Sequence, residues 1–122
     1  MRTKNRRMSR VGDLIRAALS EVLQRGLADP RVTSGLVTIT DVDVSPDLRH
    51  AIVWVSVIGD EEAQDKALAG LKAAANYLRR ELGGRIATKY TPALRFQQDR
   101  SAERGARMER TLAGLDFERE EE

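Results

Sequence analysis

The stretch that decides the fold is LVTITDVDVSPDLRHAIVWVSVI, residues 36–58. Its first limb, Val37 to Val44, consists almost entirely of β-branched residues and short acids, which favour a strand. Its second limb, Ala51 to Ile58, is nearly continuous Val and Ile with one Trp. Between the limbs, Ser45-Pro46-Asp47-Leu48 supplies a proline that presets φ and polar side chains that bond to local backbone. The stretch therefore predicts a β-hairpin.

The alternation of side chains predicts which face of the hairpin each residue occupies. One face of the second limb carries Ala51, Val53, Val55 and Val57, and the other carries His50, Ile52, Trp54 and Ser56. The first limb changes phase after Ile39, and this slip predicts a β-bulge near Thr40-Asp41. Because a lone two-stranded ribbon is unstable in water, helices must cover one face.

Apolar residues at helical spacing predict a helix on either side of the hairpin. The first helix runs from about Ser9, as N-cap, to Arg25. A second helical region is capped by Asp60 and continues to Gly83-Gly84. Unbroken, it would be ~35 Å long, about the full width of a domain of this size. We therefore expect a bend, best placed at Asn76, which is a weak helix former.

The last part of the chain predicts one more strand and one more helix. The strand spans residues 91–97, with Leu94 and Phe96 inward, and Pro92 places it at a sheet edge or strand start. A final helix is capped at residues 99–101 and ends near Leu112. The order α-β-β-α-α-β plus a C-terminal helix indicates an α+β domain, a three-stranded sheet covered by helices on one face.

Composition and charge narrow the class of protein. With 122 residues and 41% hydrophobic content, the chain forms one small domain. The absence of cysteine excludes disulfides and thiolate metal sites and favours the cytoplasm. No apolar run approaches the ~20 residues of a membrane span. Residues 1–16 and 79–110 each carry a net charge of +5, so either a polyanion partner or a solvated basic surface is indicated.

Three motifs, in this order and at these spacings, resemble the bacterial ribosome-binding factor A family. Residues 41–51, DVDVSPDLRHA, match the family's V-x-V-S-P-D-L-R-x-A run. Residues 29–31, DPR, and 92–96, PALRF, match two further motifs. The resemblance covers roughly Met8 to Leu112. It implies a type II KH-like domain and a non-enzymatic cytoplasmic factor that binds the small (30S) subunit, aids processing of the 5′ end of 16S ribosomal RNA and is linked to growth in the cold.

On this resemblance the chain divides into three parts. The predicted parts are a flexible basic arm at residues 1–7, a KH-like RNA-binding domain at 8–112 and a disordered acidic tail at 113–122. A KH domain clamps RNA with a Gly-x-x-Gly loop, but no two glycines here are three apart. The family instead has an Ala-x-Gly kink between its later helices, which aligns with Ala74-Ala75-Asn76. Asn tolerates unusual backbone angles, so either a kink or a straighter helix pair is compatible.

Basic residues of the second half of the chain predict an RNA-binding face. Arginine suits bidentate contacts with phosphate, so the expected mechanism is backbone neutralisation and shape recognition with little base reading. The residues predicted to converge on this face are Arg79, Arg80, Arg85, Lys89, Arg95, Arg100, Arg104 and Arg107. Arg6, Arg7 and Arg10 are a second predicted contact with RNA. The alternatives are a general RNA-binding KH-like protein not tied to ribosome assembly, and a protein-interaction module.

Other functions find little support in the sequence. The only histidine, His50, has no Ser, Cys or second His arranged for catalysis or metal binding. Asp41 and Asp43 could together hold Mg²⁺, but polar residues on the outer face of a sheet are the commoner explanation. Trp54 either stacks a base or, more often for such a residue, is partly buried. We expect no enzyme activity, metal, cofactor, membrane or DNA partner, and a monomer away from the ribosome.

Overall fold

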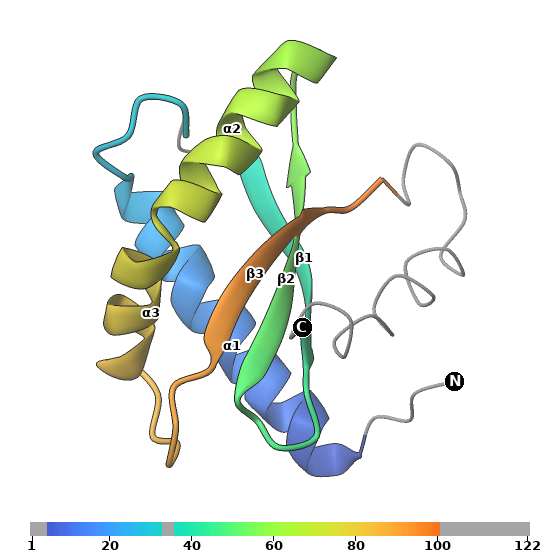
Figure 1. The fold of residues 1–122 in the computed structure, drawn as a ribbon, viewed down its shortest axis with the longest axis vertical. Coiled ribbons are helices and arrows are strands. Elements are labelled where there is room, and N and C mark those ends of the chain that lie inside the picture. Colours follow the sequence, from blue (N-terminus) through green and yellow to red (C-terminus); the bar gives the residue numbers. More distant parts are fainter. Residues whose placement is uncertain (1–4, 33–35, 101–122) are drawn as a thin grey trace.

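The computed structural model describes residues 5–32 and 36–100 (Figure 1). The elements are α1 (Arg6–Arg25), β1 (Val37–Val44), β2 (His50–Val57), α2 (Glu61–Ala73), α3 (Ala75–Gly83) and β3 (Ala93–Gln98). This is the predicted α-β-β-α-α-β order of a type II KH-like domain, and it is confirmed. The predicted C-terminal helix and acidic tail lie outside the described residues.

The hairpin has the predicted strands, turn and bulge. β1 pairs antiparallel with β2, and the register shifts between Ile39 and Asp41. In the turn, Asp47 Oδ1 accepts a hydrogen bond from the Arg49 N–H at 3.1 Å. Ser45 Oγ donates to Asp47 Oδ1 at 2.7 Å, which lowers the pKa of that carboxyl below its ordinary value. The polar turn residues therefore hold local backbone as the sequence predicts.

β3 completes the sheet as an edge strand. The strand order is β1-β2-β3, and β3 pairs with β2 in parallel, His50 opposite Ala93. Pro92, which has no backbone N–H, directly precedes β3 and so fits the start of an edge strand. The chain reaches this edge through α2 and α3, which Figure 1 shows on the way from β2 to β3.

The core lies between the three helices and one face of the sheet. All three helices contribute to a single buried cluster with the sheet, so they cover the same face, as predicted. Its fully buried members include Ile15, Leu19, Val53, Val55, Leu71, Leu78 and Leu82. Ile52 and Trp54 form a separate buried pair on the opposite face. Trp54 is only 4% exposed and its Nε1 donates to Asp43 Oδ2 at 2.8 Å, so the ring is not open for base stacking.

The first helix begins earlier than predicted. Asn5, not Ser9, is the N-cap, because Asn5 Oδ1 accepts a hydrogen bond from the Met8 N–H at 2.8 Å. The predicted start relied on the apolar period, which begins at Met8. A helix can begin before its first apolar residue, and Asn caps helices as well as Ser does. Arg6 and Arg7, which were predicted to belong to a flexible arm at residues 1–7, consequently lie in the first turn of α1.

The second helical region is broken as expected, but two residues before the predicted site. Ala74 separates α2 from α3 with φ −91° and ψ 5°, and Asn76 lies within the first turn of α3. This bridge conformation has negative φ, so alanine adopts it and neither Gly nor Asn is needed. The triplet Ala74-Ala75-Asn76 therefore holds the break although it lacks the family's glycine.

Candidate nucleic-acid interface

The segment that joins α3 to β3 is tied to both neighbouring elements. Arg79 on α3 donates from Nε and Nη2 to the carbonyl oxygen of Thr91, at 3.0 and 2.8 Å. The Ala93 N–H donates to the carbonyl oxygen of Arg49, near the start of β2, at 2.8 Å. These bonds fix the backbone at Thr91 and Ala93, where the segment meets β3.

Two cations lie over an aromatic ring in this segment. Tyr90 is 41% exposed. Arg49 Cζ is 4.1 Å and Lys89 Nζ is 5.4 Å from the ring centroid, both within the range of a cation–π interaction. Arg79 holds the next residue, as described above. We call Arg49, Arg79, Lys89 and Tyr90 the basic loop cluster, which the parallel pairing of β3 with β2 assembles from distant parts of the sequence.

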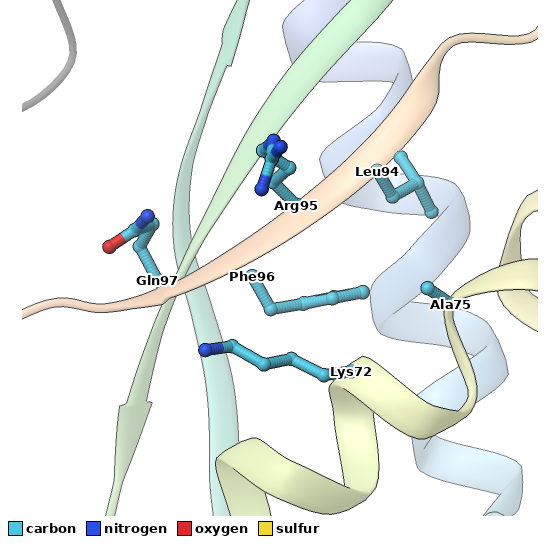
Figure 2. A pocket seen from close by; sticks show the side chains of 6 residues that line it. All are labelled: Lys72, Ala75, Leu94, Arg95, Phe96 and Gln97. Atoms are coloured by element: carbon cyan, nitrogen blue, oxygen red, sulfur yellow. The ribbon is translucent and has the colours of Figure 1, made fainter. Parts of the chain in front are cut away.

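A groove runs along the edge strand. It is a pocket of about 290 Å³ between β3 and the end of α2 and start of α3, next to the helix break. Its lining residues are Lys72, Ala75, Leu94, Arg95, Phe96 and Gln97. In Figure 2, Leu94 and Phe96 point toward the helices, Arg95 and Gln97 point away from them, and Lys72 runs alongside Phe96. This β3 groove has a mixed lining, in which Lys72 and Arg95 supply cations and the largely buried Leu94 and Phe96 lie beneath them.

The predicted single basic face is only partly formed. Arg79, Arg80 and Lys89 are exposed on α3 and the segment that follows it. Arg95, however, is paired in register with Ile52 on the face of the sheet away from the helices. Its neighbours Leu94 and Phe96 are buried in the core, so strand alternation turns Arg95 to the other side. The cations therefore border the edge strand from two sides and do not form one wall.

Arg85 is a predicted site residue whose charge is already engaged by two carboxylates of the fold. Its Nη1 lies 2.9 Å from Glu81 Oε1, and its Nε lies 3.2 Å from Glu21 Oε1 on α1. The carboxylates of Glu81 and Glu21 raise the pKa of Arg85 above its ordinary value. Arg85 thus links the end of α3 to α1, whereas a phosphate contact would have to compete with two carboxylates.

The other predicted cations lie on separate elements. Arg6, Arg7 and Arg10 are exposed at the start of α1, where the first turn holds no acidic residue. Figure 1 shows the start of α1, the β1–β2 turn and the α3–β3 segment at the same end of the molecule. After β3, Arg100 Nη2 donates to Gln98 Oε1 at 2.9 Å. Arg104 and Arg107 lie outside the described residues.

The acidic residues considered for a metal site take part in the structure of the sheet. In residues 5–32 and 36–100, no three His, Cys, Asp or Glu side chains are grouped so that they could hold a metal ion. Asp41 Oδ1 accepts from the Val42 N–H at 2.8 Å, and Asp43 accepts from Trp54, so both carboxylates serve the sheet. None of the helices described here is long and apolar enough to cross a membrane.

Arg49, Lys72 and Tyr90 were not predicted from the sequence as residues of this site. Arg49 belongs to the turn motif, and its position over Tyr90 depends on the parallel pairing of two strands distant in the chain. Lys72 reads as an ordinary exposed helix residue, and only the packing of α2 beside β3 places it in the groove. The one available signal was Lys89-Tyr90, an aromatic residue beside a cation in a loop.

Comparison with known proteins places the chain among relatives of similar length. The family model described as ribosome-binding factor A matches residues 7–112. Ribosome-binding factor A of Nostoc punctiforme is 47% identical over 115 residues, 94% of this chain and 83% of that protein. That of Trichormus variabilis is 49% identical over 104 residues, 85% of this chain and 78% of that protein.

Solved structures agree with the sequence comparison. The crystal structure of ribosome-binding factor A from Thermus thermophilus is 30% identical with a TM-score of 0.64, covering 75% of this chain and 93% of that one. A homology model of the Thermus thermophilus protein, fitted into a cryo-EM map of its complex with the 30S subunit, gives a TM-score of 0.63 at 30% identity, covering 77% of this chain and 97% of that one.

Proposed function

Since this chain belongs to the ribosome-binding factor A family, we propose that it binds the small (30S) ribosomal subunit and assists maturation of 16S ribosomal RNA, including processing of the 5′ end. The fit of the Thermus thermophilus relative into a map of a 30S complex supports this partner. In this proposal the protein is a monomeric, non-enzymatic factor that acts in the cytoplasm and needs no cofactor.

The observation that carries the RNA-binding part of the proposal is the basic loop cluster. Three of its members are cations: Arg49 and Lys89 lie over the exposed Tyr90 ring, and Arg79 is bound to the carbonyl oxygen of the next residue. Arg80 on the adjacent helix is exposed and adds a further cation. RNA phosphates bind to these side chains, and the β3 groove receives the strand that continues from them. Because phosphate contacts release counterions, binding weakens steeply with salt.

Within this proposal the remaining predicted residues make peripheral contacts. Arg95 and Arg100 meet RNA that passes over the edge strand, and Arg6, Arg7 and Arg10 meet it at the end of the molecule shared with the α3–β3 segment. Arg104 and Arg107 stay predictions from the sequence. Arg85 contributes least, because Glu81 and Glu21 already balance its charge.

The test reverses two exposed charges for which no hydrogen bond or ion pair is described above. Arg80→Glu with Lys89→Glu should greatly weaken co-sedimentation of the tagged protein with immature small subunits in a sucrose gradient. The slope of log affinity against log salt should flatten by roughly 0.7–0.9 for each phosphate that the variant no longer neutralises. Arg79 is left intact, because it holds Thr91 and its removal would disturb the loop.

A matched control makes the same change of charge elsewhere. Arg16→Glu with Arg25→Glu alters two exposed cations of α1 and should leave co-sedimentation nearly unchanged. If both double variants lost co-sedimentation to the same extent, only the net charge of the protein would matter, and the assigned surface would be contradicted. Digestion of the RNA should abolish the association, whereas an association that survives digestion would favour a protein partner.

A further inference from the structure

Tyr90 is an aromatic side chain that the fold leaves on the surface beside two cations. An exposed ring with neighbouring Arg or Lys is the combination by which many proteins hold unpaired nucleotides, the ring stacking on the base and the cations meeting the phosphates. Tyr77, on α3, is exposed to a similar extent, at 44% against 41% for Tyr90. Exposure therefore does not distinguish Tyr90 from Tyr77. The two cations over the Tyr90 ring do.

The position of the Tyr90 ring is restrained by its neighbours. The carbonyl oxygen of Tyr90 accepts a hydrogen bond from Thr88 Oγ1 at 2.7 Å, and Arg79 holds the carbonyl oxygen of Thr91. The Arg49 guanidinium carbon is 4.1 Å from the ring centroid, and its own backbone is held by Ala93. The backbone of both residues is thus held, and the Arg49 guanidinium lies over the Tyr90 ring, which reduces the ordering needed on binding.

Lys89 is held less closely than Arg49. Its ammonium nitrogen is 5.4 Å from the ring centroid, at the end of a flexible four-carbon side chain. An arriving base can therefore take the place of the ammonium group on the ring, and that group can move to the phosphate of the same nucleotide. The exchange keeps a partner for both the ring and the cation.

We propose that Tyr90 is a stacking platform for one unpaired nucleobase of single-stranded RNA, with Arg49 and Lys89 neutralising the phosphates on either side. This inference rests on the proposed function and refines it, since it adds a contact with a base to recognition of the backbone. Every base has a π face, so the platform accepts different bases and gives little sequence preference.

The test compares two oligonucleotides that share one backbone, of which only one carries bases at its centre. The probes are a fluorescein-labelled ten-nucleotide oligoadenylate and the same oligonucleotide with its bases removed at the central positions, each titrated with the full-length protein at low salt. The wild-type protein should bind the base-bearing probe roughly tenfold more tightly, as expected for one base stacked on an aromatic ring. Tyr90→Leu should bind both probes with nearly equal affinity, whereas Tyr90→Phe should keep the preference.

Tyr77→Leu is the matched control and should also keep the preference. A 2-aminopurine placed centrally in the probe should be quenched by the wild-type protein and by Tyr77→Leu but not by Tyr90→Leu, a readout that a merely structural effect would not give. Equal binding of the two probes by wild-type protein would overturn the platform while leaving RNA binding intact. Absence of binding to either probe and to small subunits would overturn the proposed function as well.

Discussion

Gly12 allows α1 to approach β1 more closely than any other residue would permit. It is buried within the helix, and a Cβ added there would lie 2.8 Å from the carbonyl oxygen of Val42 and 3.7 Å from Val44 Cγ2. The nearest atom belongs to the backbone of a paired strand, so it cannot rotate out of the way. Gly12→Ala must therefore displace α1 from the sheet.

Two opposing terms decide the size of the effect. Alanine is favoured over glycine inside a helix by about 1 kcal/mol. Overpacking a tight core contact costs about 1–3 kcal/mol, and here the whole helix must shift, which also disturbs the buried Ile15 and Leu19. We expect the packing cost to exceed the gain, so that Gly12→Ala lowers the free energy of unfolding by about 1 kcal/mol.

Urea denaturation followed by circular dichroism measures this difference. Ala17→Gly, at an exposed position of the same helix, is the control that measures the propensity term by itself. The packing cost is the decrease in stability seen in Gly12→Ala plus the magnitude of this term. A Gly12→Ala protein that is more stable than the wild type by the full propensity term would leave no packing cost and would refute the close approach of α1 to β1.

Three further changes test contacts described above. Hydrogen bonds from Arg31 hold the pKa of Asp29 at about 2 against an ordinary value of 3.8, so Asp29→Asn should reduce stability at neutral pH. That difference, followed by thermal unfolding of both proteins, should shrink as the pH falls below about 4 and vanish only below about 2, because protonation removes the same interaction from the wild type. Arg85→Gln should lower the Tm slightly at low salt and hardly at all at high salt, and weaken RNA binding less than Lys89→Gln does. Trp54→Phe should cost about 1–2 kcal/mol by removing the bond to Asp43, and a double-mutant cycle with Asp43→Ala should show coupling between the two side chains.

Much of the fold could be predicted because local sequence signals were strong. The alternation along the hairpin identified both strands, and the change of phase after Ile39 located the bulge that the pairing register confirms. The helix break was harder to place. Asn76 is a weak helix former that follows three alanines, yet the break at Ala74 uses a conformation open to alanine, so propensity could not identify the residue.

The candidate site was less predictable because its parts come together only through tertiary contacts. A count of charges identified Arg79, Arg80 and Lys89, but it could not show that Arg85 is engaged by Glu81 and Glu21. Nor could it place Arg49 over Tyr90, since that contact follows from the parallel pairing of β2 with β3. The pattern of charges in the sequence thus indicates that a partner is a polyanion more reliably than it identifies the residues that contact the partner.

The parallel pairing of β3 with β2 also bears on when the protein becomes functional. His50 and Ala93 are partners in the sheet, and both α2 and α3 lie between them in the sequence. Parallel strands joined over such a separation form late, because the connecting chain must be ordered first. A chain still being synthesised, with β3 inside the exit tunnel, therefore has neither the groove nor the Arg49–Tyr90 contact. The surface proposed to bind RNA can form only after β3 has left the exit tunnel.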